Sequence, residues 1–119
     1  MTTFYLEKGS RSEGEELTYL KVCSVDMIPV GSIKSFKVEG TEVLVINRSK
    51  DQLLCLQARC SHAGAPLVEG TIEDDILTCP WHGSKYRITN GELIRGPAKK
   101  GLQVYKHLIK DNFLFVEFE

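Results

Sequence analysis

Apolar residues recur along the chain in short stretches that alternate with turn-forming residues roughly every 8–12 positions. No window of about a dozen residues carries the i, i+3, i+4, i+7 apolar stripe of an amphipathic helix, whereas β-branched residues and leucine are frequent in the apolar stretches. The pattern therefore predicts an all-β fold, an antiparallel sandwich or barrel. The predicted strands are residues 4–6, 17–25, 33–38, 43–47, 53–58, 68–72, 76–79, 85–88, 92–94, 102–109 and 113–118.

The chain of 119 residues has the length of one domain. Residues 1–16 are predicted to form a short strand followed by a polar segment, because positions 7–16 contain no aliphatic residue. Residues 17–119 then make up a single domain. Tight hairpins are expected at residues 89–91 and 110–112, where Asn, Asp and Gly supply turn chemistry.

Charge and hydropathy exclude several classes of function. Fifteen Lys and Arg balance sixteen Asp and Glu, and the net charge of −1 gives no general attraction to nucleic acid. The longest aliphatic run, at residues 43–46, is far shorter than the roughly 20 residues that a membrane span requires. The first residues lack the pattern of a secretory signal. We therefore expect a soluble, cytoplasmic monomer with no membrane span and no nucleic-acid partner.

Two of the four cysteines stand in a concentrated set of metal-binding residue types. The chain reads Cys60-Ser-His62, then sixteen residues, then Cys79-Pro-Trp-His82. Two thiols and two imidazoles can supply four ligands to a metal centre, and the predicted hairpin between them can bring the two loops together. The other two cysteines, Cys23 and Cys55, lie inside predicted strands and are expected to be buried packing residues.

The arrangement of the four residues bears on which metal they bind. Structural zinc sites usually pair like ligands, as in Cys-x₂₋₄-Cys and His-x₃₋₅-His. Here each loop combines one thiol with one imidazole, and Cys60 and His62 are separated by a single residue. The spacing favours an iron–sulfur centre, and a zinc-stabilised structural domain remains the alternative.

The motif Cys-x-His…Cys-x₂-His resembles the ligand signature of Rieske [2Fe–2S] proteins. Upstream, Asp26-Met-Ile-Pro-Val-Gly31 resembles a turn of the soluble Rieske-type ferredoxins. The resemblance extends through Cys60-Ser-His-Ala-Gly-Ala-Pro-Leu67 and Cys79-Pro-Trp-His-Gly-Ser-Lys-Tyr86 to Arg95-Gly-Pro-Ala98, which is similar to the loop that covers the cluster in this family. It implies a Rieske-like fold, with a small cluster-binding part of two loops and a hairpin at about residues 59–95.

The resemblance also implies a role for each residue of the motif. Cys60 and Cys79 would hold one iron of a single [2Fe–2S] cluster, and His62 and His82 would hold the other. Ser84 and Tyr86 match positions at which respiratory Rieske proteins place hydroxyl donors to a bridging sulfide and to a cysteine sulfur. Such donors raise the reduction potential. The extra disulfide-forming cysteines of the respiratory proteins are replaced here by Ala65 and Trp81.

The function expected from these observations is one-electron transfer without substrate chemistry. The protein would pass electrons from a reductase to an oxygenase or another redox acceptor. The mononuclear iron domain of a terminal oxygenase needs a 2-His-1-carboxylate site, and only His107 remains outside the motif. The alternative is a small Rieske-type subunit of a larger redox enzyme, such as a nitrite reductase or an oxygenase assembly.

Overall fold

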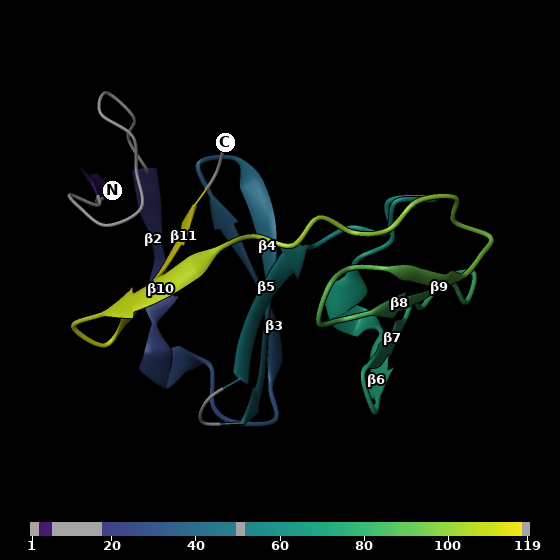
Figure 1. Cartoon of the computed structure of the whole chain (residues 1–119), viewed down its shortest axis with the longest axis horizontal. Coiled ribbons are helices and arrows are strands. Elements are labelled where there is room, and N and C mark those ends of the chain that lie inside the picture. Colours follow the sequence, from purple (N-terminus) through teal and green to yellow (C-terminus); the bar gives the residue numbers. More distant parts are fainter. Residues whose placement is uncertain (1–2, 6–17, 50–51, 118–119) are drawn as a thin grey trace.

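Three antiparallel sheets lie side by side along the longest dimension of the molecule (Figure 1). The computed structural model describes residues 3–5, 18–49 and 52–117, and its principal extents are 43 × 30 × 25 Å. The first sheet contains β1 (Thr3–Tyr5), β2 (Thr18–Ser24), β11 (Phe113–Glu117) and β10 (His107–Lys110), in that spatial order. The second contains β3 (Ile33–Val38), β4 (Thr41–Ser49) and β5 (Gln52–Gln57). The third contains β6 (Thr71–Glu73), β7 (Ile76–Thr78), β8 (Lys85–Arg87) and β9 (Leu93–Arg95).

The antiparallel all-β architecture confirms the fold class expected from the sequence. Two short 3₁₀ helices, η1 (Val25–Met27) and η2 (Leu67–Glu69), complete the fold. The hairpin between β10 and β11 turns through Asp111 and Asn112, whose φ angles of 52° and 67° are those of the primed turns that suit twisted hairpins. Within the described ranges, no helix has the length and apolar character that a bilayer crossing requires.

The middle sheet is buried on both faces. From β4, Val43 and Val45 pack into the core cluster shared with the first sheet. The intervening Leu44 and Ile46 pack into a second cluster shared with the third sheet and the loops beside it. Because successive side chains of a strand point to opposite faces, an unbroken apolar run is the pattern that a strand between two cores requires.

Two predicted strands differ from the observed elements. Residues 68–72 contain the end of η2 and only the first two residues of β6, since Gly70 lies between the two elements in close contact with the backbone of Thr78. Residues 102–106 of the predicted strand 102–109 are not a strand; Val104 forms only an isolated bridge with Leu56. The polar segment at 7–16 lies outside the described residues.

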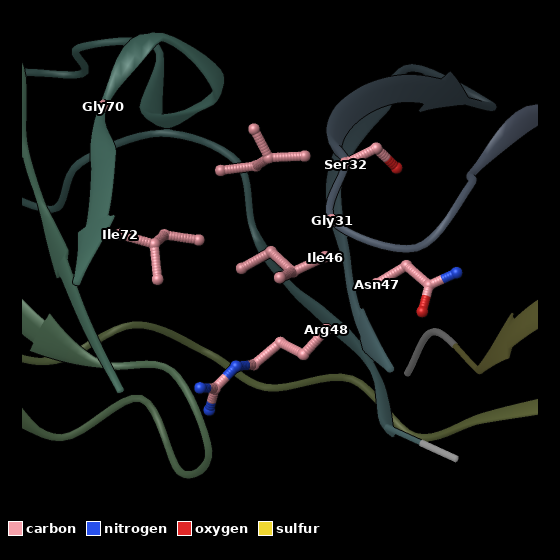
Figure 2. Close-up of a pocket in the computed structure, with 8 residues that line it drawn as sticks. Gly31, Ser32, Ile46, Asn47, Arg48, Gly70 and Ile72 are labelled. Carbon is pink, nitrogen blue, oxygen red and sulfur yellow. The ribbon is translucent and has the colours of Figure 1, made fainter. Parts of the chain in front are cut away.

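A cleft of about 340 Å³ separates the middle sheet from the third sheet. Figure 2 shows Ile46 and Arg48 extending from β4 to the side on which Ile72 lies, whereas Asn47 extends to the opposite side. The Arg48 guanidinium forms an ion pair with Asp75, in the turn between β6 and β7. This pair links the middle sheet to the third sheet, and its arginine also lines the cleft.

A second arginine joins the middle sheet to the loop that begins at Cys60. Arg59 donates to both carboxylate oxygens of Glu42, at 2.9 and 3.4 Å, and to the Gly64 carbonyl at 3.2 Å. The hydrogen bond from Arg59 lowers the pKa of Glu42 below its usual value of 4.5. Arg59 therefore fixes the position of this loop relative to β4.

The depressed pKa of Glu42 predicts part of the acid sensitivity of the fold. A carboxyl whose pKa is lower in the folded state stabilises the protein above its unfolded pKa, and that contribution is lost as the pH falls through the folded pKa. In urea titrations from about pH 7 down to about pH 3, Glu42→Gln should therefore lose less stability than the parent protein. The control is Glu73→Gln, at an exposed position of β6. A Glu42→Gln protein with the same acid slope as the parent would contradict this account.

Candidate metal centre

The two loops that carry the predicted ligands have the same backbone hydrogen-bond pattern. In the first loop, the carbonyl of Cys60 accepts from Gly64 N–H at 3.0 Å, and Cys60 N–H donates to the Ala65 carbonyl at 2.9 Å. In the second loop, the Cys79 carbonyl accepts from the backbone N–H of the residue four positions later, at 3.2 Å. The Cys79 N–H donates to the carbonyl of the residue five positions later, at 2.8 Å. The two loops are therefore structurally equivalent, with each cysteine at the start.

A glycine with positive φ closes each loop. Gly64 has a φ of 74° and Gly83 a φ of 81°, a region that side chains with a Cβ rarely adopt. The histidines lie just before these glycines, His62 two positions after its cysteine and His82 three positions after its own.

The structure brings the four predicted ligands together as two like pairs. Cys60 and Cys79 are buried, with 4% and 3% of their surface exposed, and their side chains lie within hydrogen-bonding distance. The rings of His62 and His82 are exposed, and their centroids lie 5.1 Å apart in an edge-to-face arrangement. In the described part of the chain, no group of three or more His, Cys, Asp or Glu is placed to hold one metal ion.

Hydrogen-bond donors surround the Cys60 sulfur. Burial raises the pKa of this thiol, but hydrogen bonds from the Tyr86 hydroxyl, the His62 and Ala63 backbone N–H groups and the Cys79 thiol outweigh it and lower the pKa. The donors favour a deprotonated sulfur, which is the form that ligates metals. The Cys60 position is thus prepared for a thiolate.

Tyr86 and Ser84 are fully buried beside the two loops. The Tyr86 hydroxyl lies 3.0 Å from the Cys60 sulfur. Burial and this contact raise the pKa of Tyr86, so the phenol keeps its proton and can act as a donor. The Ser84 hydroxyl accepts a hydrogen bond from Ala98 N–H at 2.9 Å, and this bond does not use its own proton.

Residues 95–101 form the third segment of the site, and one serine from each loop contacts it. Ser84 accepts from Ala98, as described above, and Ser61 donates to the Lys100 carbonyl at 2.7 Å. Beyond this segment, Leu102 N–H donates to the Gly91 carbonyl at 2.8 Å. Sequence reasoning missed Ser61, because a serine between two predicted ligands carries no signal that its partner lies 39 residues further along the chain.

The remaining cysteines lie away from the site, as expected. Cys23 on β2 and Cys55 on β5 are buried free thiols in the core cluster between the first and second sheets. Burial raises the pKa of Cys23 to about 11 and that of Cys55 to about 12, which leaves both thiols protonated and unreactive. Trp81, between Cys79 and His82, is 56% exposed at the surface.

The residues present fit a [2Fe–2S] cluster with mixed ligation. Such a cluster takes two protein ligands on each iron, and the loops supply one pair of buried thiols and one pair of imidazoles. Each pair takes one residue from each loop, and the two loops have equivalent backbone hydrogen bonds. The backbone N–H groups that donate to the Cys60 sulfur suit a ligating thiolate.

Comparison with known proteins agrees with this fit. The family model of the Rieske [2Fe–2S] domain matches residues 18–106. The ferredoxin CarAc of Metapseudomonas resinovorans is 30% identical over 101 residues, which cover 85% of this chain and 94% of that protein. The cytochrome b6-f complex iron–sulfur subunit of Chlorobaculum thiosulfatiphilum is 35% identical over 102 residues, which cover 86% of this chain and 53% of that protein.

A solved complex of reduced oxygenase and oxidised ferredoxin in carbazole 1,9a-dioxygenase contains a chain that superposes with a TM-score of 0.72. That chain is 28% identical in sequence, and the match covers 83% of this chain and 92% of that one. These matches assign a [2Fe–2S] cluster as the cofactor and one-electron transfer as the role. The chain belongs to the Rieske [2Fe–2S] domain family.

Proposed function

We propose that the protein is a soluble, cytoplasmic ferredoxin that carries one electron at a time from a reductase to an oxygenase. The observation that carries this proposal is the pair of exposed imidazoles, His62 and His82, beside the buried thiols of Cys60 and Cys79. The match to CarAc over 94% of that ferredoxin's length supports a free-standing carrier, and the oxygenase–ferredoxin complex supports an oxygenase as the acceptor.

The ligand assignment is part of this proposal. Cys60 and Cys79 hold one iron through their sulfurs, and His62 and His82 hold the other through one ring nitrogen each. When bound, the cluster takes up and returns one electron at roughly −150 to +300 mV. Two neutral imidazoles in place of two thiolates leave less negative charge at the site, and an added electron is therefore better tolerated than with four cysteines.

Exposure at the site decides where electrons enter and leave. The two imidazoles reach the surface while the two sulfurs are almost fully buried, so a partner approaches the histidine side most closely. The exposed Trp81 lies on the same loop as His82 and adds apolar surface there. We infer that reductase and oxygenase use this one surface in turn, as a mobile carrier requires.

The relation to the cytochrome b6-f subunit supports a second candidate, a Rieske-type subunit held permanently in a larger redox enzyme. The two candidates differ in whether the protein must leave its partner between electrons. A carrier acts on many partner molecules, whereas a subunit acts only in a stoichiometric complex.

The ligand assignment predicts the iron content of single variants. Cys60→Ala, Cys79→Ala, His62→Ala and His82→Ala should each lose the cluster, because each leaves one iron with a single protein ligand. The purified parent protein should contain about two irons per chain. The control Cys23→Ala removes a buried cysteine far from the loops and should keep both irons. Full iron content in any of the four ligand variants would contradict the assignment of that residue.

The two hydroxyl groups predict shifts in the reduction potential. Ser84→Ala and Tyr86→Phe should each lower the midpoint, because a donor aimed at sulfur stabilises the negative charge of the added electron. The shift is about 40 mV for each kcal/mol of lost stabilisation. Tyr105→Phe removes the hydroxyl of a half-buried residue that packs against the core between the first two sheets, and it serves as the control. Unchanged midpoints in Ser84→Ala and Tyr86→Phe would show that neither group is a donor to the cluster.

The carrier proposal is tested with the reductase and oxygenase components of carbazole 1,9a-dioxygenase, with this protein in place of the native ferredoxin. A catalytic amount of the iron-loaded protein should support many turnovers of carbazole per ferredoxin chain, since each chain shuttles repeatedly. The cluster-free protein and Cys60→Ala should support none.

Gel filtration of the tagged protein from its own cells provides the second measurement. Elution only in a stable complex with a larger redox enzyme would overturn the carrier in favour of the subunit.

A further inference from the structure

Ser61, between the predicted ligands Cys60 and His62, takes part in a chain of hydrogen bonds that ends at the Cys60 sulfur. Its hydroxyl lies 2.7 Å from the Lys100 carbonyl and 3.1 Å from the Tyr86 hydroxyl. The Tyr86 hydroxyl in turn lies 3.0 Å from the Cys60 sulfur. Ser61 therefore connects residues 95–101 to the hydroxyl group that contacts this sulfur.

The number of hydroxyl protons in this series of hydrogen bonds fixes the direction of each bond. A carbonyl oxygen only accepts, so the Ser61 proton is donated to Lys100. With its single proton used there, Ser61 can only accept from Tyr86. A ligating Cys60 is a thiolate and also only accepts. The one proton of Tyr86 therefore has two acceptors at nearly equal distance, the Ser61 oxygen and the Cys60 sulfur.

We propose that Ser61 is a positioning residue that sets the reduction potential by competing with the Cys60 sulfur for the Tyr86 proton. This inference rests on the proposed ligand role of Cys60. Because the Ser61 hydroxyl donates its proton to the Lys100 carbonyl, it can only accept a hydrogen bond from Tyr86. A partner that moves Lys100 away would free that proton for Tyr86, commit the Tyr86 proton to the sulfur and raise the potential.

The two serines that contact residues 95–101 do so with opposite polarity. Ser84 accepts from Ala98 N–H and keeps its own proton for another acceptor, whereas Ser61 gives its proton to Lys100. Ser84 thus supplies a hydrogen-bond donor to the site, whereas Ser61 competes with the Cys60 sulfur for the donor of Tyr86. The same substitution to alanine should consequently shift the midpoint in opposite directions at the two positions.

The test is a set of redox titrations on the iron-loaded protein. Ser61→Ala should raise the midpoint, opposite in sign to Tyr86→Phe and Ser84→Ala, because the Tyr86 proton then has one acceptor. Ser61→Gly should act in the same way, and Ser61→Thr, which keeps the hydroxyl, should stay close to the parent. In a Tyr86→Phe background, Ser61→Ala should shift the midpoint by much less, because the proton in competition is gone.

Three outcomes would overturn the proposal: a lower midpoint in Ser61→Ala, an unchanged one, or a full-sized shift that persists in the Tyr86→Phe background. The last would indicate that Ser61 acts through packing or solvent access rather than through Tyr86. Iron content and the EPR signal are recorded for every variant. If the parent protein lacked two irons, the proposed ligand set would fail, whereas intact clusters with the wrong shift would contradict only the role of Ser61.

Discussion

The fold depends on a strand pair that is buried on both faces. In β4 and β5, successive side chains alternate between the core shared with the first sheet and the core shared with the loops of the metal centre. Full burial of one such aliphatic side chain contributes roughly 1.5–3 kcal/mol. The third sheet consists of strands of three residues each, so its stability relies on Leu44, Ile46 and Leu56 from the middle sheet.

The metal centre is built on this support by repeating one loop design twice. Each cysteine is held by two backbone hydrogen bonds to its own loop, and each loop turns at a glycine with positive φ. Arg59 ties the first loop to Glu42, and the serines Ser61 and Ser84 tie both loops to residues 95–101. The electrostatics of the site then depend on where a few hydroxyl protons point, because the sulfurs are buried and the imidazoles are exposed.

Much of the fold and of the metal centre could be predicted from the sequence, because local residue patterns indicate both. The mixed thiol and imidazole spacing indicated two loops on one centre, and the turn residues located the hairpins. The apolar run at residues 43–46 predicted a strand, but a run alone does not say that two separate cores cover its faces. Residues 102–106 have the composition of a strand but do not form one. Their backbone contacts the middle sheet through isolated hydrogen bonds, such as the one from Tyr105 N–H to the Cys55 carbonyl. The contacts of Ser61 with Lys100 and Arg59 with Glu42 join residues distant in sequence, and no local pattern announces them.

In the proposed ligand set, one buried thiol pair and one exposed imidazole pair together hold a [2Fe–2S] cluster. A redox titration of the purified protein, followed by EPR, distinguishes this ligand set from four cysteine ligands and from a zinc site. Mixed ligation predicts a rhombic signal on reduction, with an average g value below that of all-cysteine clusters and a midpoint between roughly −150 and +300 mV. A midpoint near −400 mV would indicate four cysteine ligands. No signal, in a protein that contains one zinc, would show that the same four residues form a structural site.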